Sequence, residues 1–188
     1  MSAPMRLFFA VFPPPEAQAI AARATDALRA TRGGNSVSWV RRDNLHFTLR
    51  FLGDQDDAGF AAAQAAARDA VKAQSAFTLG VGGLGAFPNA KRARVLWAGL
   101  TSGEAAIRKL SKALETALAK HGFAPADHDF EPHLTLGRVR TPADWSERLA
   151  KTPSPDTTFR VEKLLLVQSA LAPGGSRYDV VGEAKLKA

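Results

Sequence analysis

The chain contains no cysteine. A disulfide framework, thiolate catalysis and zinc sites built on cysteine ligands are therefore excluded. A sequence without cysteine also fits a reducing compartment, and we expect the protein to be cytoplasmic.

The sequence also lacks a long hydrophobic run. Its one apolar N-terminal stretch, residues 7–12, is too short for a signal-peptide core or a membrane span and leads directly into three prolines. No long linker divides the 188 residues, of which 46% are hydrophobic, enough for a sizeable core. We therefore expect a soluble, unexported monomer that forms a single domain over residues 1–188 and has no membrane partner.

Positive charge is in excess, with 25 Lys and Arg residues against 18 Asp and Glu residues and a formal net charge of +7. Such a balance favours polyanionic partners, of which nucleic acid is the commonest. A basic surface is equally a solubility trait. The charge therefore supports a nucleic-acid partner only in combination with a site that would recognise one.

One short pattern occurs twice: His46-Phe47-Thr48-Leu49 returns as His133-Leu134-Thr135-Leu136. Alternate side chains of an extended strand share a face, so His46 and Thr48 point one way while Phe47 and Leu49 point the other. The second copy obeys the same rule. Two such strands placed side by side would form a polar cleft with an imidazole and a hydroxyl on each side.

Hydrophobic periodicity around these motifs predicts alternating strands and helices. Strands are expected at residues 6–12, 37–40, 46–52, 77–81, 94–100, 133–139, 159–170 and 178–181. Helices are expected from the three prolines to Gly33, over 57–73, between a capping box at Thr101 and Glu104 and Gly122, and over 142–150. His121 should lie at the C-terminal end of the third helix.

The strand at 94–100 aligns with that at 6–12 by a shift of 88 residues, and the two histidines are 87 residues apart. This repetition predicts an α+β fold of two lobes, built from pseudo-repeats at roughly 5–85 and 93–170. Two mainly antiparallel sheets would line a central groove, with helices on the outer faces and the histidines opposed across a pseudo-two-fold axis. The glycine-rich residues 80–85 and the basic residues 91–94 would form a flexible loop between the lobes.

Two imidazoles across a cleft suit in-line phosphoryl displacement, because one can accept a proton from water while the other donates a proton to the departing oxygen. The Thr48 and Thr135 hydroxyls and an arginine would hold the charged phosphate oxygens. Arg138 suits this role if Gly137 lets the strand twist, whereas strict alternation favours Arg50. The sequence leaves this choice open.

These motifs resemble the two-histidine phosphoesterase superfamily, and most closely the RNA 2′,3′-cyclic phosphodiesterases of the group once called 2′-5′ RNA ligases. The resemblance covers most of the chain and does not depend on His-x-Thr alone. It rests on residues 6–10, 39–41, 44–49, 51–53, 85–88, 94–97 and 130–138. Gly137 stands where the family often has alanine, a departure that we regard as harmless.

The resemblance implies hydrolysis of a 2′,3′-cyclic phosphate at an RNA end or on a nucleotide to a 2′-phosphomonoester, without a metal or cofactor. His46 would be the general acid for the leaving 3′-oxygen and His133 the general base, although pseudo-symmetry makes them equivalent in the sequence. Thr48, Thr135 and Arg138 would bind the phosphate. The reverse reaction would join a cyclic phosphate end to a 5′-hydroxyl as weak 2′-5′ ligation.

Two other functions stay open: a non-catalytic module that binds RNA ends, and a related enzyme for another cyclic or 2′-5′ linked phosphodiester. Phe9 and Trp97, in equivalent places of the repeat, could stack on a base, although core packing is the favoured role. His128 lies among acidic residues near His133. We expect no metal there, because His133 faces elsewhere in the strand pattern.

Overall fold

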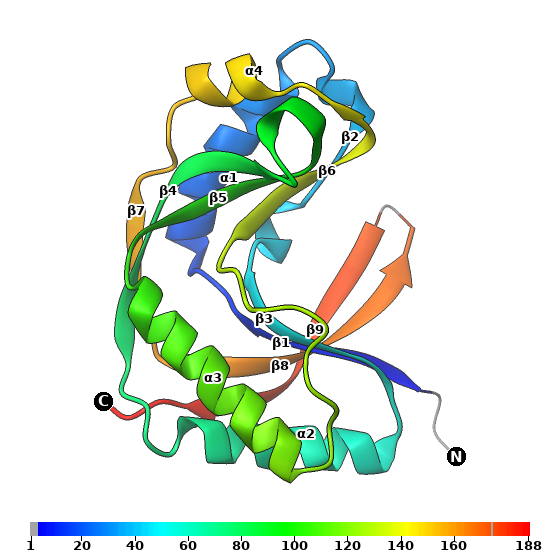
Figure 1. Cartoon of the computed structure of the whole chain (residues 1–188), viewed down its shortest axis with the longest axis vertical. Helices are drawn as coiled ribbons and strands as arrows, with labels where there is room; N and C mark the ends of the chain where they lie inside the picture. The colour runs from blue at the N-terminus through cyan, green and yellow to red at the C-terminus, as the bar shows by residue number, and fades with distance from the viewer. Residues whose placement is uncertain (1–3, 174) are drawn as a thin grey trace.

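The computed structural model describes residues 4–173 and 175–188, which form a strongly curled antiparallel sheet with four α-helices around it (Figure 1). The strands are β1 (Met5–Val11), β2 (Val37–Trp39), β3 (Phe47–Gln55), β4 (Phe77–Phe87), β5 (Ala93–Ser102), β6 (Leu134–Ala143), β7 (Thr157–Val161), β8 (Lys163–Ala172) and β9 (Gly175–Lys185). The helices are α1 (Pro15–Arg29), α2 (Asp57–Val71), α3 (Glu104–Lys120) and α4 (Ser146–Lys151). The α+β class is confirmed.

The strands follow the order β7-β4-β5-β6-β3-β1-β8-β9, and β2 pairs with β6. We call β3, β1, β8 and β9 the first lobe and the remaining strands the second lobe. The two lobes are joined by one residue pair, Phe47 on β3 with Leu134 on β6. The two sheets expected from the sequence are therefore parts of one continuous sheet. α1 contacts β2, β6 and β7 of the second lobe, whereas α2 contacts the first lobe and α3 packs on α2 (Figure 1).

The pairing of β1 with β3 recurs in the pairing of β5 with β6. Ala10 lies opposite Thr48, and 87 residues further along the chain Trp97 lies opposite Thr135. The shift of 88 residues expected for the first strand is therefore wrong by one, and Trp97 is equivalent to Ala10 rather than to Phe9. The division into pseudo-repeats at 5–85 and 93–170 stays a prediction.

Each lobe takes a strand from the other half of the chain. β4 follows β3 and α2 in sequence but pairs with β5, and β8 pairs with β1 near the N-terminus. The single strand expected at 159–170 is wrong for this reason. β7 pairs with β4 and β8 with β1, so the chain changes sheet neighbours at Glu162, which a continuous apolar pattern cannot reveal.

Three local expectations are also corrected. Residues 80–85 lie inside β4 and not in a loop, with the Trp97 indole packed where a side chain at Gly85 would stand. Thr101 belongs to β5, so α3 begins after Gly103, whose φ of 81° is accessible to glycine, and there is no capping box. The last short helix starts at Ser146, because Pro142 extends β6.

The main hydrophobic core lies between the outer face of the sheet and the helices. Phe9, Phe47 and Leu134 are fully buried in it, so core packing is confirmed for Phe9. A second, small cluster of Phe8, Ala10 and Val167 lies on the opposite face of the first lobe. Within the described residues no helix is long and apolar enough to cross a membrane.

One contact to α2 and one to the sheet hold α3 and its following loop. His121 is the C-cap of α3 as expected, and its Nε2 lies 2.9 Å from Asp69 Oδ2 on α2. Arg50 on β3 donates to Glu115 Oε2 on α3 at 3.1 Å and to the carbonyl oxygen of Ala124 at 2.6 Å. The Arg50 side chain is only 12% exposed, so this ion pair is shielded from solvent.

We expect Arg50→Met to lower the free energy of unfolding by about 1–3 kcal/mol, because Glu115 would keep a partly buried charge without its partner. Urea unfolding at neutral pH measures the change. Arg42→Met is the matched control: the Arg42–Asp43 pair is exposed and should contribute at most about 0.5 kcal/mol. Equal effects of the two substitutions would contradict a stabilising role for the Arg50 contacts.

Candidate active site

The junction between β3 and β6 brings the two predicted motifs together. Phe47 and Leu134 are paired and fully buried, so the side chains before and after each of them point to the opposite, concave face. One step outward from this pair, antiparallel register sets His46 against Thr135 and Thr48 against His133. Two imidazoles and two hydroxyls therefore share one cleft.

β3 and β6, the strands that carry the two His-x-Thr motifs, each contain a β-bulge. These bulges decide which arginine lies in the cleft with the histidines and threonines. In β6 the partners of Gly137 and Thr135 are the adjacent residues Leu96 and Trp97, so Leu136 is an extra residue. The alternation reverses there, and Arg138 falls on the face of His133 and Thr135.

The equivalent bulge in β3 turns Arg50 away from the cleft. Phe9 and Ala10 are adjacent partners of Arg50 and Thr48, which leaves Leu49 as the extra residue. Arg50 accordingly points to the helix side, where it binds Glu115. Strict alternation had favoured Arg50, and the bulge is the physical reason that this reading of the sequence is wrong.

His46 is held in one tautomer. Its Nδ1 lies 2.6 Å from the carbonyl oxygen of Asn44, which can only accept, so Nδ1 carries the proton. In the neutral ring Nε2 is then unprotonated, and it accepts a hydrogen bond from Thr48 Oγ1 at 2.8 Å. The hydroxyl and the ring nitrogen therefore face the same point in the cleft.

Aromatic rings from distant parts of the chain enclose His46. Phe12 stacks on the imidazole at a centroid distance of 5.1 Å, Phe8 lies at 5.1 Å, and Tyr178 from β9 meets it edge-on at 5.3 Å. The pKa of His46 is lowered to about 4, mainly by burial among these rings and also by the charges of His133 and Arg138, while the Asn44 hydrogen bond opposes the shift.

His133 has a similar hydrogen bond but a more open surrounding. Its Nδ1 donates to the carbonyl oxygen of Glu131 at 2.7 Å, which again leaves Nε2 unprotonated in the neutral ring. Phe87 contacts the ring edge-on at a centroid distance of 4.9 Å. Partial burial lowers the pKa of His133, the Glu131 carbonyl opposes this, and the positive charge of Arg138 lowers it again.

Arg138 is the group that links the two histidines electrostatically, since its charge lowers the pKa of both. It is exposed on the concave face, and Thr135 precedes it on the same side of β6. A cation beside two imidazoles and two hydroxyls forms a site for an anion with several oxygens. The structure thus brings together His46, Thr48, His133, Thr135 and Arg138.

Phe51 is a cleft residue that the sequence reasoning missed. It is 63% exposed, and its ring lies 5.6 Å from that of Phe8, which also contacts His46. The signal for it was the constant shift of 87 residues, which makes Phe51 the equivalent of Arg138. Trp97, the other aromatic candidate, lies half-buried against Phe87 at a ring distance of 5.2 Å.

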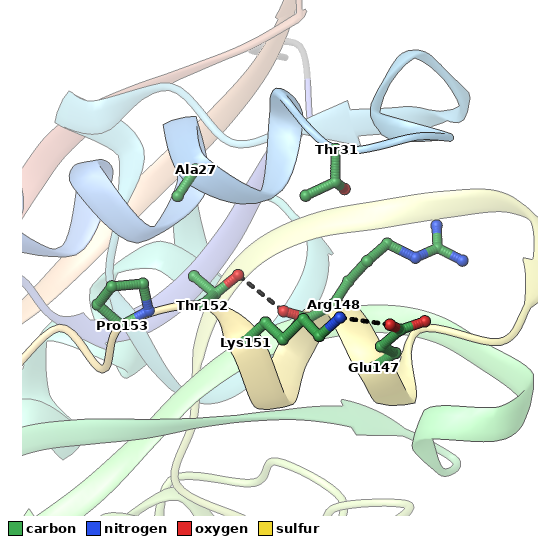
Figure 2. A pocket seen from close by; sticks show the side chains of 7 residues that line it. All are labelled: Ala27, Thr31, Glu147, Arg148, Lys151, Thr152 and Pro153. Atoms are coloured by element: carbon green, nitrogen blue, oxygen red, sulfur yellow. Dashed lines mark hydrogen bonds and ion pairs between the residues drawn. The ribbon is translucent and has the colours of Figure 1, made fainter.

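A separate cavity of about 370 Å³ lies between α1 and α4 and includes Thr31 and Pro153 (Figure 2). Its polar groups bind one another: Lys151 Nζ donates to Glu147 Oε1 at 2.6 Å, and Thr152 Oγ1 donates to the Arg148 carbonyl at 2.8 Å. It offers no paired base and acid. Across residues 4–173 and 175–188, no group of three or more His, Cys, Asp or Glu residues gathers as metal ligands would.

Two imidazoles and two hydroxyls that share one cleft of an antiparallel sheet define a two-histidine phosphoesterase type of site. The family model of the 2′-5′ RNA ligase superfamily matches residues 12–172, and the chain belongs to this superfamily.

Named relatives agree with this membership. The RNA 2′,3′-cyclic phosphodiesterase of Methanothermobacter thermautotrophicus is 32% identical over 160 residues, which cover 83% of this chain and 85% of the relative. That of Aquifex aeolicus is 34% identical over 149 residues, or 77% and 79% of the two chains.

Solved structures share the fold over nearly the whole length. TT0787 of Thermus thermophilus superimposes with a TM-score of 0.81 and 30% identity, covering 98% of this chain and 99% of that one. E. coli LigT in complex with 3′-AMP gives a TM-score of 0.78 and 26% identity with the same coverage.

The burial of His46 predicts a pH-dependent stability. Its folded pKa of about 4 lies below the ordinary 6.5, so the unfolded chain binds the extra proton between these values, and stability falls as the pH drops through this window. The loss should reach about 3 kcal/mol at pH 4 relative to pH 7. Urea unfolding of the wild type and of His46→Gln at both pH values measures it.

The difference in acid-induced loss of stability between the wild type and His46→Gln gives the contribution of His46 alone, because all other titrating groups are the same in both proteins. His46→Gln should show a smaller loss of stability on acidification, whereas His128→Gln, at an exposed position, should behave as the wild type. Identical acid sensitivity of wild type and His46→Gln would show that the imidazole is not desolvated.

Proposed function

We propose that this protein hydrolyses the 2′,3′-cyclic phosphate of RNA ends or nucleotides to a 2′-phosphomonoester. One observation carries the proposal: two imidazoles with fixed tautomers direct Nε2 into a single cleft, where the charge of Arg138 acts on both. The relatives are named RNA 2′,3′-cyclic phosphodiesterases, which supports the proposal. The site lies in a monomer that we expect in the cytoplasm.

The reaction is an in-line displacement with balanced proton transfers. His133 Nε2 takes a proton from water as the water oxygen bonds to phosphorus, and His46 Nε2 gives a proton to the 3′-oxygen as its bond to phosphorus breaks. The carbonyls of Asn44 and Glu131 keep both Nδ1 atoms protonated, so Nε2 of each ring exchanges the proton. The enclosed His46 faces the leaving group, and the more open His133 is accessible to water.

Thr48, Thr135 and Arg138 hold the phosphate. Negative charge grows on the non-bridging oxygens in the transition state, and preorganised donors in a shielded cleft stabilise it. Because the phosphate is anionic, its arrival raises the pKa of the histidines and supplies the protonated form that His46 needs. Phe51 offers an exposed ring beside the cleft on which a nucleobase can stack.

The same residues account for two further expectations. The chemistry needs no metal or other cofactor, because water, two imidazoles and an arginine supply every proton and charge. Run backwards with an RNA 5′-hydroxyl in place of water, the reaction forms a 2′-5′ linkage. The description of the matching superfamily, 2′-5′ RNA ligase, supports this second activity at the same site.

We expect His46→Ala and His133→Ala each to lower kcat on adenosine 2′,3′-cyclic phosphate by about 10²–10⁴-fold, since each removes one arm of general acid–base catalysis. Turnover in EDTA, with chromatographic separation of 2′-AMP from 3′-AMP, measures the change and the product. Thermal unfolding of each variant shows that the fold persists.

His121→Ala is the control histidine, because its ring lies at the end of α3 outside the cleft. Saturable binding of cyclic-phosphate RNA ends with no product would favour a non-catalytic RNA-end module instead. Turnover confined to a 2′-5′ linked oligonucleotide or to ADP-ribose cyclic phosphate would favour a different phosphodiesterase, and a requirement for added metal would remove the mechanism.

The lowered histidine pKa values predict an acidic optimum for kcat/KM. One imidazole must be protonated and one neutral in the free enzyme, so kcat/KM should be bell-shaped between about 4, set by His46, and a value below 6.5, set by His133. The profile of kcat should lie at higher pH, because bound phosphate raises both pKa values. A kcat/KM maximum above pH 7 would contradict this electrostatic account.

A further inference from the structure

A second arginine continues from the cleft along β6. Arg138 and Arg140 are exposed, and Val139 between them is buried against Val37 of β2. β6 bulges against β5 between Arg138 and Ala143, but the buried Val139 separates two exposed arginines, so Arg138 and Arg140 both lie on the side of β6 away from the core. Because Arg138 acts electrostatically on both histidines, that face is the one that opens onto the cleft.

The pair Arg138 and Arg140 on β6 has no charged counterpart on β3, the matching strand of the first lobe. Shifting by 87 residues relates Arg138 to Phe51 and Arg140 to Gly53, so the first lobe offers a ring and no charge at the same places. The two sides of the cleft therefore differ in chemistry: the first lobe suits a base, and the second suits phosphates.

Neither arginine is engaged by an acid in the described part of the chain. Arg50, a neighbour in the same sheet, shows the contrast, because its guanidinium is bound by Glu115 and by a carbonyl. A guanidinium without an internal partner keeps its forked donors for an external oxyanion, and phosphate matches that fork in charge and geometry.

The spacing along β6 fits a nucleic-acid backbone. Two residues of an extended strand span at most about 7 Å, a reach comparable to the separation of successive phosphates in an extended single strand. The basic residues Lys91 and Arg92, in a short 3-10 helix and not in the expected flexible loop, and Arg94 on β5 lie beyond, because Ala93 pairs with Ala143 near the end of β6. Positive charge thus extends outward from the cleft in one direction.

We propose that Arg140 binds the phosphate on the 5′ side of the terminal nucleotide, so that the enzyme prefers the end of an RNA chain to a free cyclic nucleoside phosphate. The inference rests on the proposed function and names its substrate class. Contact with the backbone carries no base preference. Arg140 is a specificity-determining residue, and the chemical step does not require it.

Three substrates isolate this phosphate: adenosine 2′,3′-cyclic phosphate, the same nucleotide carrying a 5′-phosphate, and the dinucleotide ApA with a 2′,3′-cyclic phosphate. The wild type should turn over the second and third with a higher kcat/KM than the first. Arg140→Gln should lower kcat/KM for both by about five- to tenfold, the effect of one charged phosphate contact, and leave the first substrate unchanged.

Arg23→Gln is the matched control, because Arg23 is an exposed arginine of α1 beside the separate groove near Pro153. Salt gives an independent readout. For the dinucleotide, the slope of log kcat/KM against log salt concentration should become shallower by about 0.7 in Arg140→Gln, as expected for one lost contact to a single strand. Arg23→Gln should keep the wild-type slope.

The outcomes separate the two proposals. A wild type that hydrolyses the unphosphorylated nucleotide but shows no Arg140-dependent preference would overturn this inference alone. A preference for the dinucleotide without one for the 5′-phosphorylated nucleotide would assign recognition to the upstream nucleoside and would also overturn it. No hydrolysis of any of the three would overturn the proposed function, and this inference with it.

Discussion

The buried pair of Phe47 and Leu134 is the contact on which the active site depends. It is the one residue pair that joins β3 to β6, and both side chains are fully buried. Full burial of side chains of this size stabilises a fold by roughly 1.5–3 kcal/mol each. The polar neighbours of this pair have no freedom to turn inward, so the apolar contact on one face of the sheet positions the imidazoles and hydroxyls on the other.

Each side of the cleft is built from both halves of the chain. β4 and β8 each cross to the lobe of the other half, so neither half of the chain holds a complete lobe. A cleft built on one continuous sheet suits a reaction whose acid and base must lie on opposite sides of one phosphorus atom.

The matching strand pairs β1–β3 and β5–β6 present the two histidines in equivalent positions, whereas the proposed reaction needs them to differ. Their hydrogen bonds are alike, since each Nδ1 donates to the carbonyl two residues before it. Their surroundings are not alike: Phe8, Phe12 and Tyr178 surround His46, and Phe87 alone meets the ring of His133 among the described aromatic contacts. The same divergence gives Phe51 to one lobe and Arg138 to the other. The chemistry of the site therefore lies in the departures from symmetry.

The sequence by itself determined the parts of this protein that depend on local periodicity. Paired His-x-Thr motifs on strands, the three long helices and the antiparallel α+β class all follow from alternation and helical spacing, which the chain carries within a few residues. The candidate residues His46, Thr48, His133 and Thr135 could be named for the same reason. The repeat was also visible, although its first strand was aligned one residue out of register.

Only the tertiary structure decided the matters that depend on partners far away in the chain. The bulges at Leu49 and Leu136 are defined by their opposite strands, and they alone select Arg138 over Arg50. The break between β7 and β8 follows from their pairing with different ends of the sheet. The lowered pKa of His46 comes from burial by residues as distant as Tyr178. Register, sheet neighbours and desolvation are non-local quantities, so no pattern within one segment contains them.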